Sequence, residues 1–259
     1  MSIDDIPTWL LFVITTLLVA GTIELGYLAG KRAHRRSEDE KESPVSAIAG
    51  TVLALLAFIL AFSFSIVTDR YDARKALVRE QAASIRTAYK SSDFLPPELR
   101  DESQELYREF IALVVTAGTT GQAGDELAET VARLRDIQEQ LWDLAVENVE
   151  RGDTTDISSF YVQSVDEMRN VTALRVAVAV QSRMPPRLMI VLYVLVGLGM
   201  FAVGYQTAIA ASRRTWMMLL LALSFSIVMT LIAVLDNPER GVIGVSQQPL
   251  IDLQKQMSQ

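Results

Sequence analysis

Hydrophobic positions are not spread evenly along the chain but gather in four long runs. They extend from Trp9 to about Gly30, from Val45 to Val67, from Leu188 to about Ala210 and from Trp216 to Leu235. Each run holds roughly 20 residues with almost no charge, which is the length that a helix needs to cross about 30 Å of hydrocarbon. The pattern therefore predicts a membrane protein with four transmembrane helices.

An alternative for the first run is a cleaved signal peptide. The residues before it include Asp4 and Asp5 but no basic residue, and its apolar stretch is longer than a typical signal-peptide core. Both features favour a retained transmembrane helix.

Residues 68–187 form the only sizeable polar part of the sequence. Their apolar residues recur at steps of three and four, which is the spacing of one face of an α-helix, and the alternating pattern of strands is missing. We therefore expect a helical domain outside the bilayer and an all-α chain as a whole. The periodic positions are Leu106, Phe110 and Leu113, then Leu127, Val131, Leu134, Ile137, Leu141 and Leu144, and then Ile157, Tyr161, Val165, Met168 and Val171.

Proline and glycine mark where the helices are expected to break, at residues 94–97, 118–124, Gly152 and 184–186. Nothing interrupts helix between Val45 and about Ser92, so the second span is expected to continue out of the bilayer into the helical domain. The predicted order is a first transmembrane hairpin in 1–67, the helical domain in 68–187, a second hairpin in 188–235 and a C-terminal tail in 236–259.

An eight-residue segment of the second run reappears in the fourth. Residues 221–228 differ from residues 60–67 at one position of the eight. One interpretation is that the two transmembrane hairpins descend from one duplicated unit, which would make the second and fourth helices run in the same direction. The other is that the likeness arose by chance, because transmembrane segments are built from few types of apolar residue. The sequence leaves both interpretations open.

Composition narrows the range of functions. The chain has no cysteine, one histidine and a formal net charge of −7, which argues against a disulfide scaffold, a thiol enzyme, a zinc site and a general nucleic-acid surface. His34 lies in a basic loop and is expected to face lipid headgroups. No phosphate-binding loop, nucleophile elbow or metalloprotease motif is present. We therefore expect no enzyme, no cofactor or bound metal, and no nucleic-acid partner.

Glu24 lies inside the first run, where an ionised carboxylate is costly without a partner or water. One interpretation is an ion or proton site. The other is that the carboxylate, about 10 Å from Lys31 at helical rise, reaches the interface or a basic group of a neighbouring helix. Gly26 and Gly30, four residues apart, are interpreted as a helix-packing contact.

The second run carries the most specific pattern. Ala54, Phe58, Phe62, Ser65 and Asp69 fall within about 80° of arc when successive residues are placed 100° apart. From residue 54 to residue 69, the side chains of this stripe are first small, then aromatic, then hydroxyl-bearing and finally acidic. It suits the wall of an ion pore, where apolar rings gate by dewetting and polar groups at the mouth select ions. The alternative is ordinary packing, with the phenylalanines inside a helix bundle and the acid marking the bilayer surface.

The segments 69–78 (DRYDARKALV) and 82–89 (AASIRTAY), the latter followed by Leu95-Pro96, stand at the start of the helical domain. Together with 235–241 (LDNPERG) and 245–250 (VSQQPL), they resemble a bacterial membrane family whose domain is called bestrophin-like, over nearly the whole chain. Bestrophins proper are pentameric ion channels with four spans per subunit and a neck lined by apolar residues of the second helix. The resemblance implies the same plan, with the two phenylalanines of the stripe in the neck.

The chain departs from the bestrophin pattern at two places. Ala54 stands one turn before Phe58, where a larger apolar residue is usual, which leaves the tightness of any constriction open. Animal bestrophins follow the Asn-Pro turn after the fourth span with an acidic cluster that binds calcium, whereas residues 240–245 here contain no oxygen-rich run. Calcium gating is therefore not predicted.

The orientation in the membrane stays open. The two short loops are basic, which would place them in the cytoplasm by the positive-inside rule. The helical domain is also basic near both of its membrane ends, and the resemblance implies that this domain is cytoplasmic. The loop residues are Lys31, Arg32, Arg35, Arg36, Lys41, Arg213 and Arg214, and the domain residues are Arg70, Arg74, Lys75, Arg79, Arg86, Arg169, Arg175, Arg183 and Arg187.

These patterns favour a homo-oligomer, a pentamer by resemblance, that passes small inorganic ions through the plasma or bacterial inner membrane along an axial pore. Residues 68–187 hold 21 acidic and 15 basic residues, a net charge of −6, and with Asp69 at the mouth this favours cations. The bestrophins that the chain resembles pass anions. The alternative function is a non-conducting, membrane-anchored module whose helical bundle binds a partner.

Overall fold

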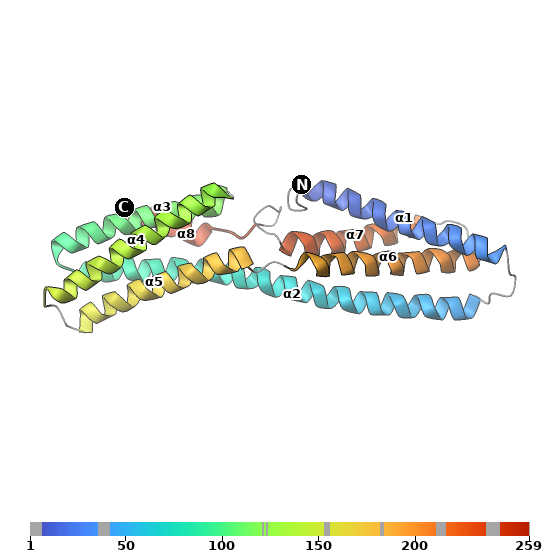
Figure 1. Ribbon diagram of the computed structural model, residues 1–259, viewed down its shortest axis with the longest axis horizontal. Coiled ribbons are helices and arrows are strands. Elements are labelled where there is room, and N and C mark those ends of the chain that lie inside the picture. The colour runs from blue at the N-terminus through green and yellow to red at the C-terminus, as the bar shows by residue number, and fades with distance from the viewer. Residues whose placement is uncertain are drawn as a thin grey trace. The chain divides into compact units, whose positions relative to one another are not determined.

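The structure is a computed structural model, and it describes residues 7–35, 42–120, 122, 124–152, 156–181, 184–210, 216–236 and 244–258. Every regular element within these residues is a helix, which confirms the all-α prediction (Figure 1). Several residues of the sequence analysis lie outside the described part of the chain. They are Asp4, Asp5, Arg36, Lys41, Arg183, Arg213, Arg214 and the segment 237–243.

The helices begin and end close to the predicted breaks. Gly152, with a φ of +96°, stands in the connection between α4 and α5, where a side chain would be strained. The elements are α1 (Thr8–His34), α2 (Glu42–Ser91), the 3-10 turn η2 (Ser92–Phe94), α3 (Pro97–Thr120), α4 (Asp125–Glu150), α5 (Asp156–Gln181), α6 (Pro186–Ile209), α7 (Trp216–Asp236) and α8 (Gln248–Met257).

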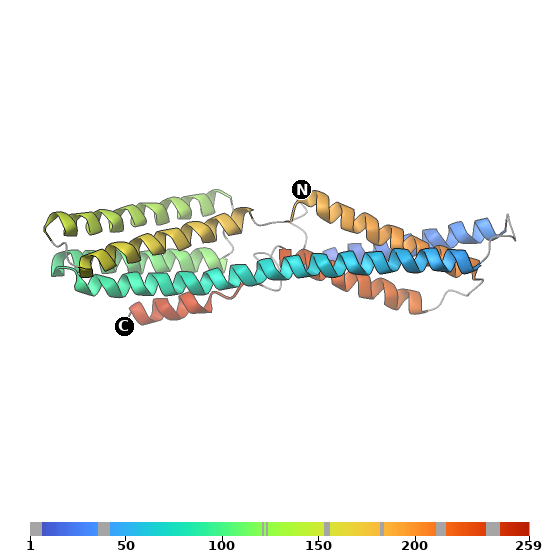
Figure 2. The ribbon, with the colours of Figure 1, turned by 90° about the horizontal axis from the view of Figure 1, so that it is seen from below.

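The chain divides into two compact units. The span unit comprises Met1–Tyr71 and Arg183–Gly244, and the bundle unit comprises Asp72–Ser182 and Val245–Gln259. Helix α2 contributes residues to both units and is one uninterrupted helix, as Figure 2 shows. The predicted continuation of the second span beyond the apolar run is therefore confirmed.

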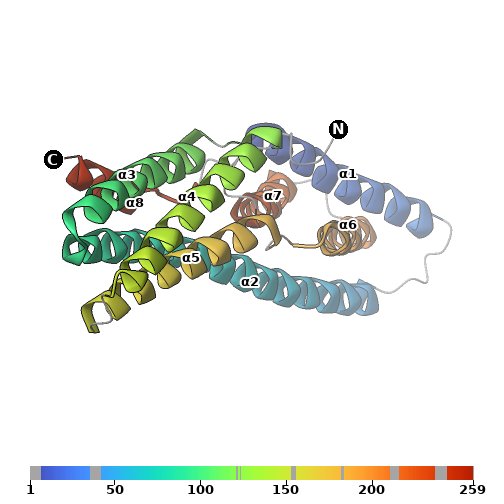
Figure 3. The ribbon, with the colours of Figure 1, turned by 60° about the vertical axis from the view of Figure 1, so that its left-hand side comes forward.

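The span unit consists of α1, α6, α7 and the first part of α2. All four are long and apolar enough to cross a membrane, which confirms the four predicted spans. In Figures 1 and 3, α6 and α7 lie between α1 and this part of α2. Buried residues from all four helices form one apolar cluster that includes Val19, Leu56, Val196 and Met229.

Helices α1 and α6 approach one another closely because glycines line their crossing. A Cβ atom added at Gly26 would lie 2.1 Å from the carbonyl oxygen of Phe201, and one at Gly204 would lie 2.0 Å from that of Ile23. Glycine alone allows backbones this near, which is the usual device for helix association in lipid. The packing role predicted for Gly26 and Gly30 is confirmed.

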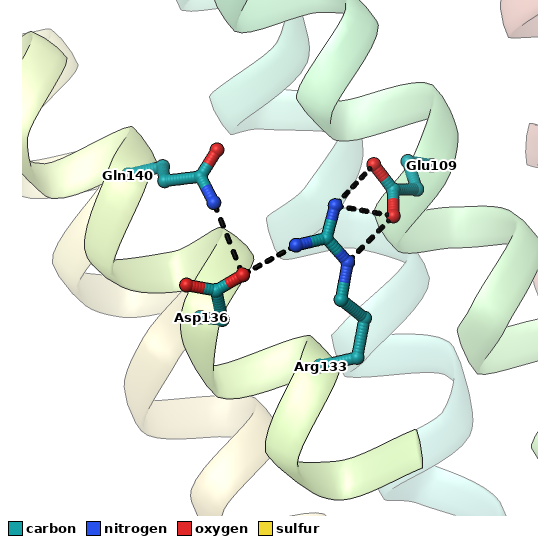
Figure 4. A network of polar contacts seen from close by, with 4 residues as sticks. All are labelled: Glu109, Arg133, Asp136 and Gln140. Carbon is teal, nitrogen blue, oxygen red and sulfur yellow. Dashed lines mark hydrogen bonds and ion pairs between the residues drawn. The ribbon is translucent and has the colours of Figure 1, made fainter. Parts of the chain in front are cut away.

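The bundle unit packs α3, α4 and α5 against the second part of α2. Most of the predicted stripe positions are buried, among them Phe110, Ile137, Leu141, Val165 and Met168. Leu127 and Val131, near the start of α4, are half-exposed instead. The opposite face of α4 is charged and solvated. There Arg133 forms ion pairs with Glu109 of α3 and with Asp136, which also accepts a bond from Gln140 (Figure 4).

The C-terminal residues, which the sequence analysis set apart as a tail, complete the bundle unit. Leu250, Leu253 and Met257 of α8 are buried in its apolar cluster. The Nε atom of Arg108 donates to the Met257 carbonyl oxygen at 3.2 Å. The Nη2 atom of Arg175 donates to the Gln247 side chain at 2.7 Å, just before α8 begins.

Hydroxyl groups pair inside the bundle unit. The hydroxyl oxygens of Ser103 and Tyr161 lie 2.8 Å apart, and those of Ser91 and Ser164 lie 2.6 Å apart. Burial raises the pKa of Tyr107 well above its ordinary value, and the nearby Tyr161 adds to this shift. Burial also raises the pKa of Tyr161.

Replacing Gly204 with valine is expected to lower stability by about 1–3 kcal/mol or more, because its new side chain meets the backbone of α1. Gly21→Val in α1 is the matched control, because no atom lies within 4 Å of a Cβ placed there. The melting temperature in detergent should fall for Gly204→Val alone. Equal losses in both variants would contradict the close crossing.

Alkaline pH is expected to destabilise the bundle unit through its buried tyrosines. A folded-state pKa above the unfolded value of about 10 leaves the stability intact below pH 10, and the stability is lost as the pH rises toward the folded-state pKa. Replacing Tyr107 with phenylalanine removes the more strongly shifted group. The loss of melting temperature between pH 8 and pH 10.5 should therefore shrink in this variant, and an unchanged loss would contradict the prediction.

Candidate functional site

The predicted stripe of α2 lies on the outside of the span unit. Ala54, Phe58, Phe62, Ser65 and Asp69 are all exposed, and the two phenylalanines keep 70% and 63% of their surface accessible. The alternative interpretation, in which these phenylalanines pack inside the helix bundle, therefore does not apply to them.

The buried side of α2 is directly opposite the stripe. Leu56, Leu60, Ser63 and Val67 are buried, and at 100° per residue their centre lies about 170° away from that of the stripe. The contacts of α2 with α6 include Leu56, whose Cδ2 would lie 2.7 Å from a Cβ at Gly199. The stripe thus points away from the side of α2 that packs into the span unit.

Asp69 and Arg70 are neighbours in sequence, but their side chains leave α2 about 100° apart. Arg70 turns toward the end of α7, where its Nη1 atom lies 3.6 Å from Oδ1 of Asp236. Asp236 is nearly buried, and its two carboxylate oxygens accept the Met184 backbone N–H at 2.9 and 3.1 Å. This junction joins α2, the end of α7 and the residues before α6. It fixes which way α2 faces, so that Asp69 is left exposed.

A groove runs along the surface of the span unit between α2 and α7. Its volume is about 420 Å³, and its walls are almost entirely apolar. Both copies of the repeated segment, residues 60–67 and 221–228, contribute to it. Helices α2 and α7 run in the same direction in Figure 1, as two hairpins descended from one unit would require. The groove is lined by Ala57, Leu60, Ala61 and Phe64 of α2 and by Ser224, Phe225, Val228 and Leu231 of α7.

Glu24 is not part of the α2 stripe. It is half-buried on α1, between the buried residues Ile23 and Gly26, and α1 packs against α6 and α7. Among the described residues, no cluster of three or more histidine and acidic side chains could hold a metal ion.

Sequence reasoning did not find the Asp236 junction or the groove. The junction had a partial signal, since Arg70 and Asp236 are charged residues that each stand just beyond an apolar run. Their pairing, however, joins residues far apart in the chain. The groove had no local signal, because it depends on how two helices are spaced.

The fold and the apolar spans define the protein as a multi-pass, all-helical membrane protein. Residues 16–250 match the model of the bestrophin-like domain family. The chain therefore belongs to this family, as the sequence motifs indicated. No curated protein sequence matches it.

Solved structures of a bacterial bestrophin homologue from Klebsiella pneumoniae, each of a form with a point mutation, share this fold. One mutant form is similar with a TM-score of 0.72 and 12% identity, over 95% of this chain and 97% of that one. A second mutant form gives a TM-score of 0.66 and 12% identity over 95% and 96%. A third gives a TM-score of 0.61 and 14% identity over 95% and 94%.

Replacing Asp236 with alanine is expected to reduce stability by about 1–3 kcal/mol, because the Met184 N–H loses its acceptor and Arg70 loses its partner. The measurement is the melting temperature of the detergent-solubilised protein. Asp69→Ala serves as the control, since Asp69 is exposed and should change the melting temperature little. A drop in the control as large as in Asp236→Ala would show that the junction has no special role.

Proposed function

We propose that this protein is an oligomeric ion channel in which copies of α2 surround an axial pore. The pore is lined by Ala54, Phe58, Phe62, Ser65 and Asp69. The observation that carries the proposal is the exposure of both phenylalanines on the side of α2 opposite its own bundle. Membership of the bestrophin-like family supports it, because the bestrophins that the chain resembles are ion channels with a neck lined by the second helix.

The order of side chains along the stripe agrees with a pore. Phe58 and Phe62 stand one turn apart, so a ring of subunits would carry two successive apolar rings that can close the path by dewetting. Ser65 and Asp69 follow at the end that leaves the hydrocarbon, where hydroxyl and carboxylate groups meet hydrated ions. Lipid would accept the phenylalanines equally well, but it gives no reason for an exposed acid and hydroxyl on the same line.

Charge favours small cations as the permeant species. Asp69 is exposed, and residues 68–187 carry a net charge of −6, which raises the local concentration of cations. The proposed location is the plasma or bacterial inner membrane, with the bundle unit in the cytoplasm. The sign of the diffusion potential across liposomes under a salt gradient tests the ion preference directly.

Removing the two rings is expected to raise ion leakage several-fold. Purified protein and a Phe58→Ala, Phe62→Ala double variant are reconstituted into liposomes, and ion flux is measured at equal protein density. The variant should leak more because the dewetted segment becomes wider and less apolar. Leu17→Ala with Leu25→Ala is the matched control, because these residues are 68% and 61% exposed on α1.

Equal leakage through the original protein and the double variant, or none through either, would count against a channel gated at this ring. The rival function, a non-conducting membrane anchor, predicts a monomer or dimer. The native mass of the detergent complex separates the two, because a closed ring of subunits has no purpose in a simple anchor.

A further inference from the structure

The two flanks of the α2 stripe differ in side-chain size. On one flank, Ala57 and Ala61 are small and exposed, and they open onto the groove between α2 and α7. On the other flank, Ile48 and Leu55 are large, and 64% and 56% of their surfaces are exposed. We call these two residues the α2 ridge. One helix thus carries a hollow and a ridge on opposite sides of the same stripe.

A closed ring brings these two flanks together. Each copy in a cyclic assembly is related to the next by rotation, so one flank of a subunit must meet the opposite flank of its neighbour. For about five subunits the neighbours lie roughly 55° to either side of the inward direction. At 100° per residue, Ala61 lies about 60° from the centre of the stripe on one side, and Leu55 lies about 60° from it on the other.

The heights of the two surfaces also match. Rotation about the ring axis keeps each residue at its own level along that axis. Leu55 of the ridge stands about 3 Å from the level of Ala57, the first groove residue of α2, at helical rise. A large side chain from one copy therefore faces a small one from the next.

We infer that the α2–α7 groove is the seat for the α2 ridge of a second copy of this chain. The inference rests on the proposed function, because it takes the stripe to face a shared axis. With the stripe inward, the groove opens toward the neighbouring subunit and not toward lipid. Leu55 enters it beside Ala57 and Ala61, while Phe58 and Phe62 stay turned toward the axis.

The absence of cysteine allows a direct test by disulfide formation. Leu55→Cys and Ala57→Cys are placed on separate chains with tags of different mass, which are co-expressed and oxidised in the membrane. A disulfide forms only when the two Cα atoms come within about 7 Å. The mixed pair should give at least fivefold more heterodimer than either variant gives homodimer. The matched control pairs Ala57→Cys with Leu17→Cys, which is 68% exposed on α1, and should give no product.

A second variant checks the seat without cysteines. Ala61→Trp fills the groove and is expected to shift the native mass to smaller species, whereas Leu25→Trp, at a site 61% exposed on α1, should leave the assembly intact. If a lipid chain occupies the groove, Ala61→Trp leaves the mass unchanged and the mixed pair gives no dimer, which overturns the inference. Predominant Ala57→Cys homodimers would overturn it as well.

The flux assay separates this inference from the proposed function. Conduction by the original protein, together with absence of the mixed disulfide, would reject the seat and leave the channel standing. A monomeric mass with no conduction would reject the channel itself. A mixed disulfide together with loss of assembly in Ala61→Trp supports the seat.

Discussion

The one-sided burial of α2 is the constraint on which the rest of this structure depends. A transmembrane helix satisfies its own backbone hydrogen bonds, so it can remain uncovered on one side without leaving polar groups unpaired in lipid. Helix α2 uses this freedom: Leu56, Leu60 and Val67 pack into the span unit while Phe58 and Phe62 stay exposed. What covers those phenylalanines in the membrane decides whether the protein moves ions.

The orientation of α2 about its own axis is set by charge as well as by apolar packing. Arg70 turns inward to the nearly buried carboxylate of Asp236, which also accepts the N–H of Met184. A buried charge is costly unless it is paired, so this contact resists rotation of α2. Because Asp69 is about 100° further round the helix, the same contact leaves Asp69 exposed at the end of the stripe.

The span unit packs its helices in two different ways. Glycines bring α1 and α6 into backbone contact, and a Cβ at Gly26 or Gly204 would overlap the facing carbonyl. Helix α2 instead meets its neighbours through longer side chains such as Leu56, and the looser fit leaves the groove beside α7. The bundle unit follows the rules of a water-soluble domain, with buried apolar stripes and ion pairs such as Arg133 with Glu109 on its surface.

Local periodicity determined the helices and much of the candidate site. Hydrocarbon thickness fixes the length of a spanning run, and the helical repeat places Ala54, Phe58, Phe62, Ser65 and Asp69 on one line, so the spans and the stripe were both visible in the sequence. The four-residue spacing of Gly26 and Gly30 predicted a close helix contact, because the helical repeat places both glycines on one face. Whether the stripe faced inward or outward was not visible, because an apolar residue is compatible with a bundle core, with lipid and with a partner.

Only the tertiary structure decided the contacts between segments that are distant in the chain. Asp236 meets Met184 and Arg70, α8 completes the bundle unit, and the two copies of the repeated segment line one groove. These features depend on the distance and rotation between helices, which a local pattern does not encode. The sequence by itself determined which residues share a helix face, whereas the packing of neighbouring helices determined which of those faces remained uncovered.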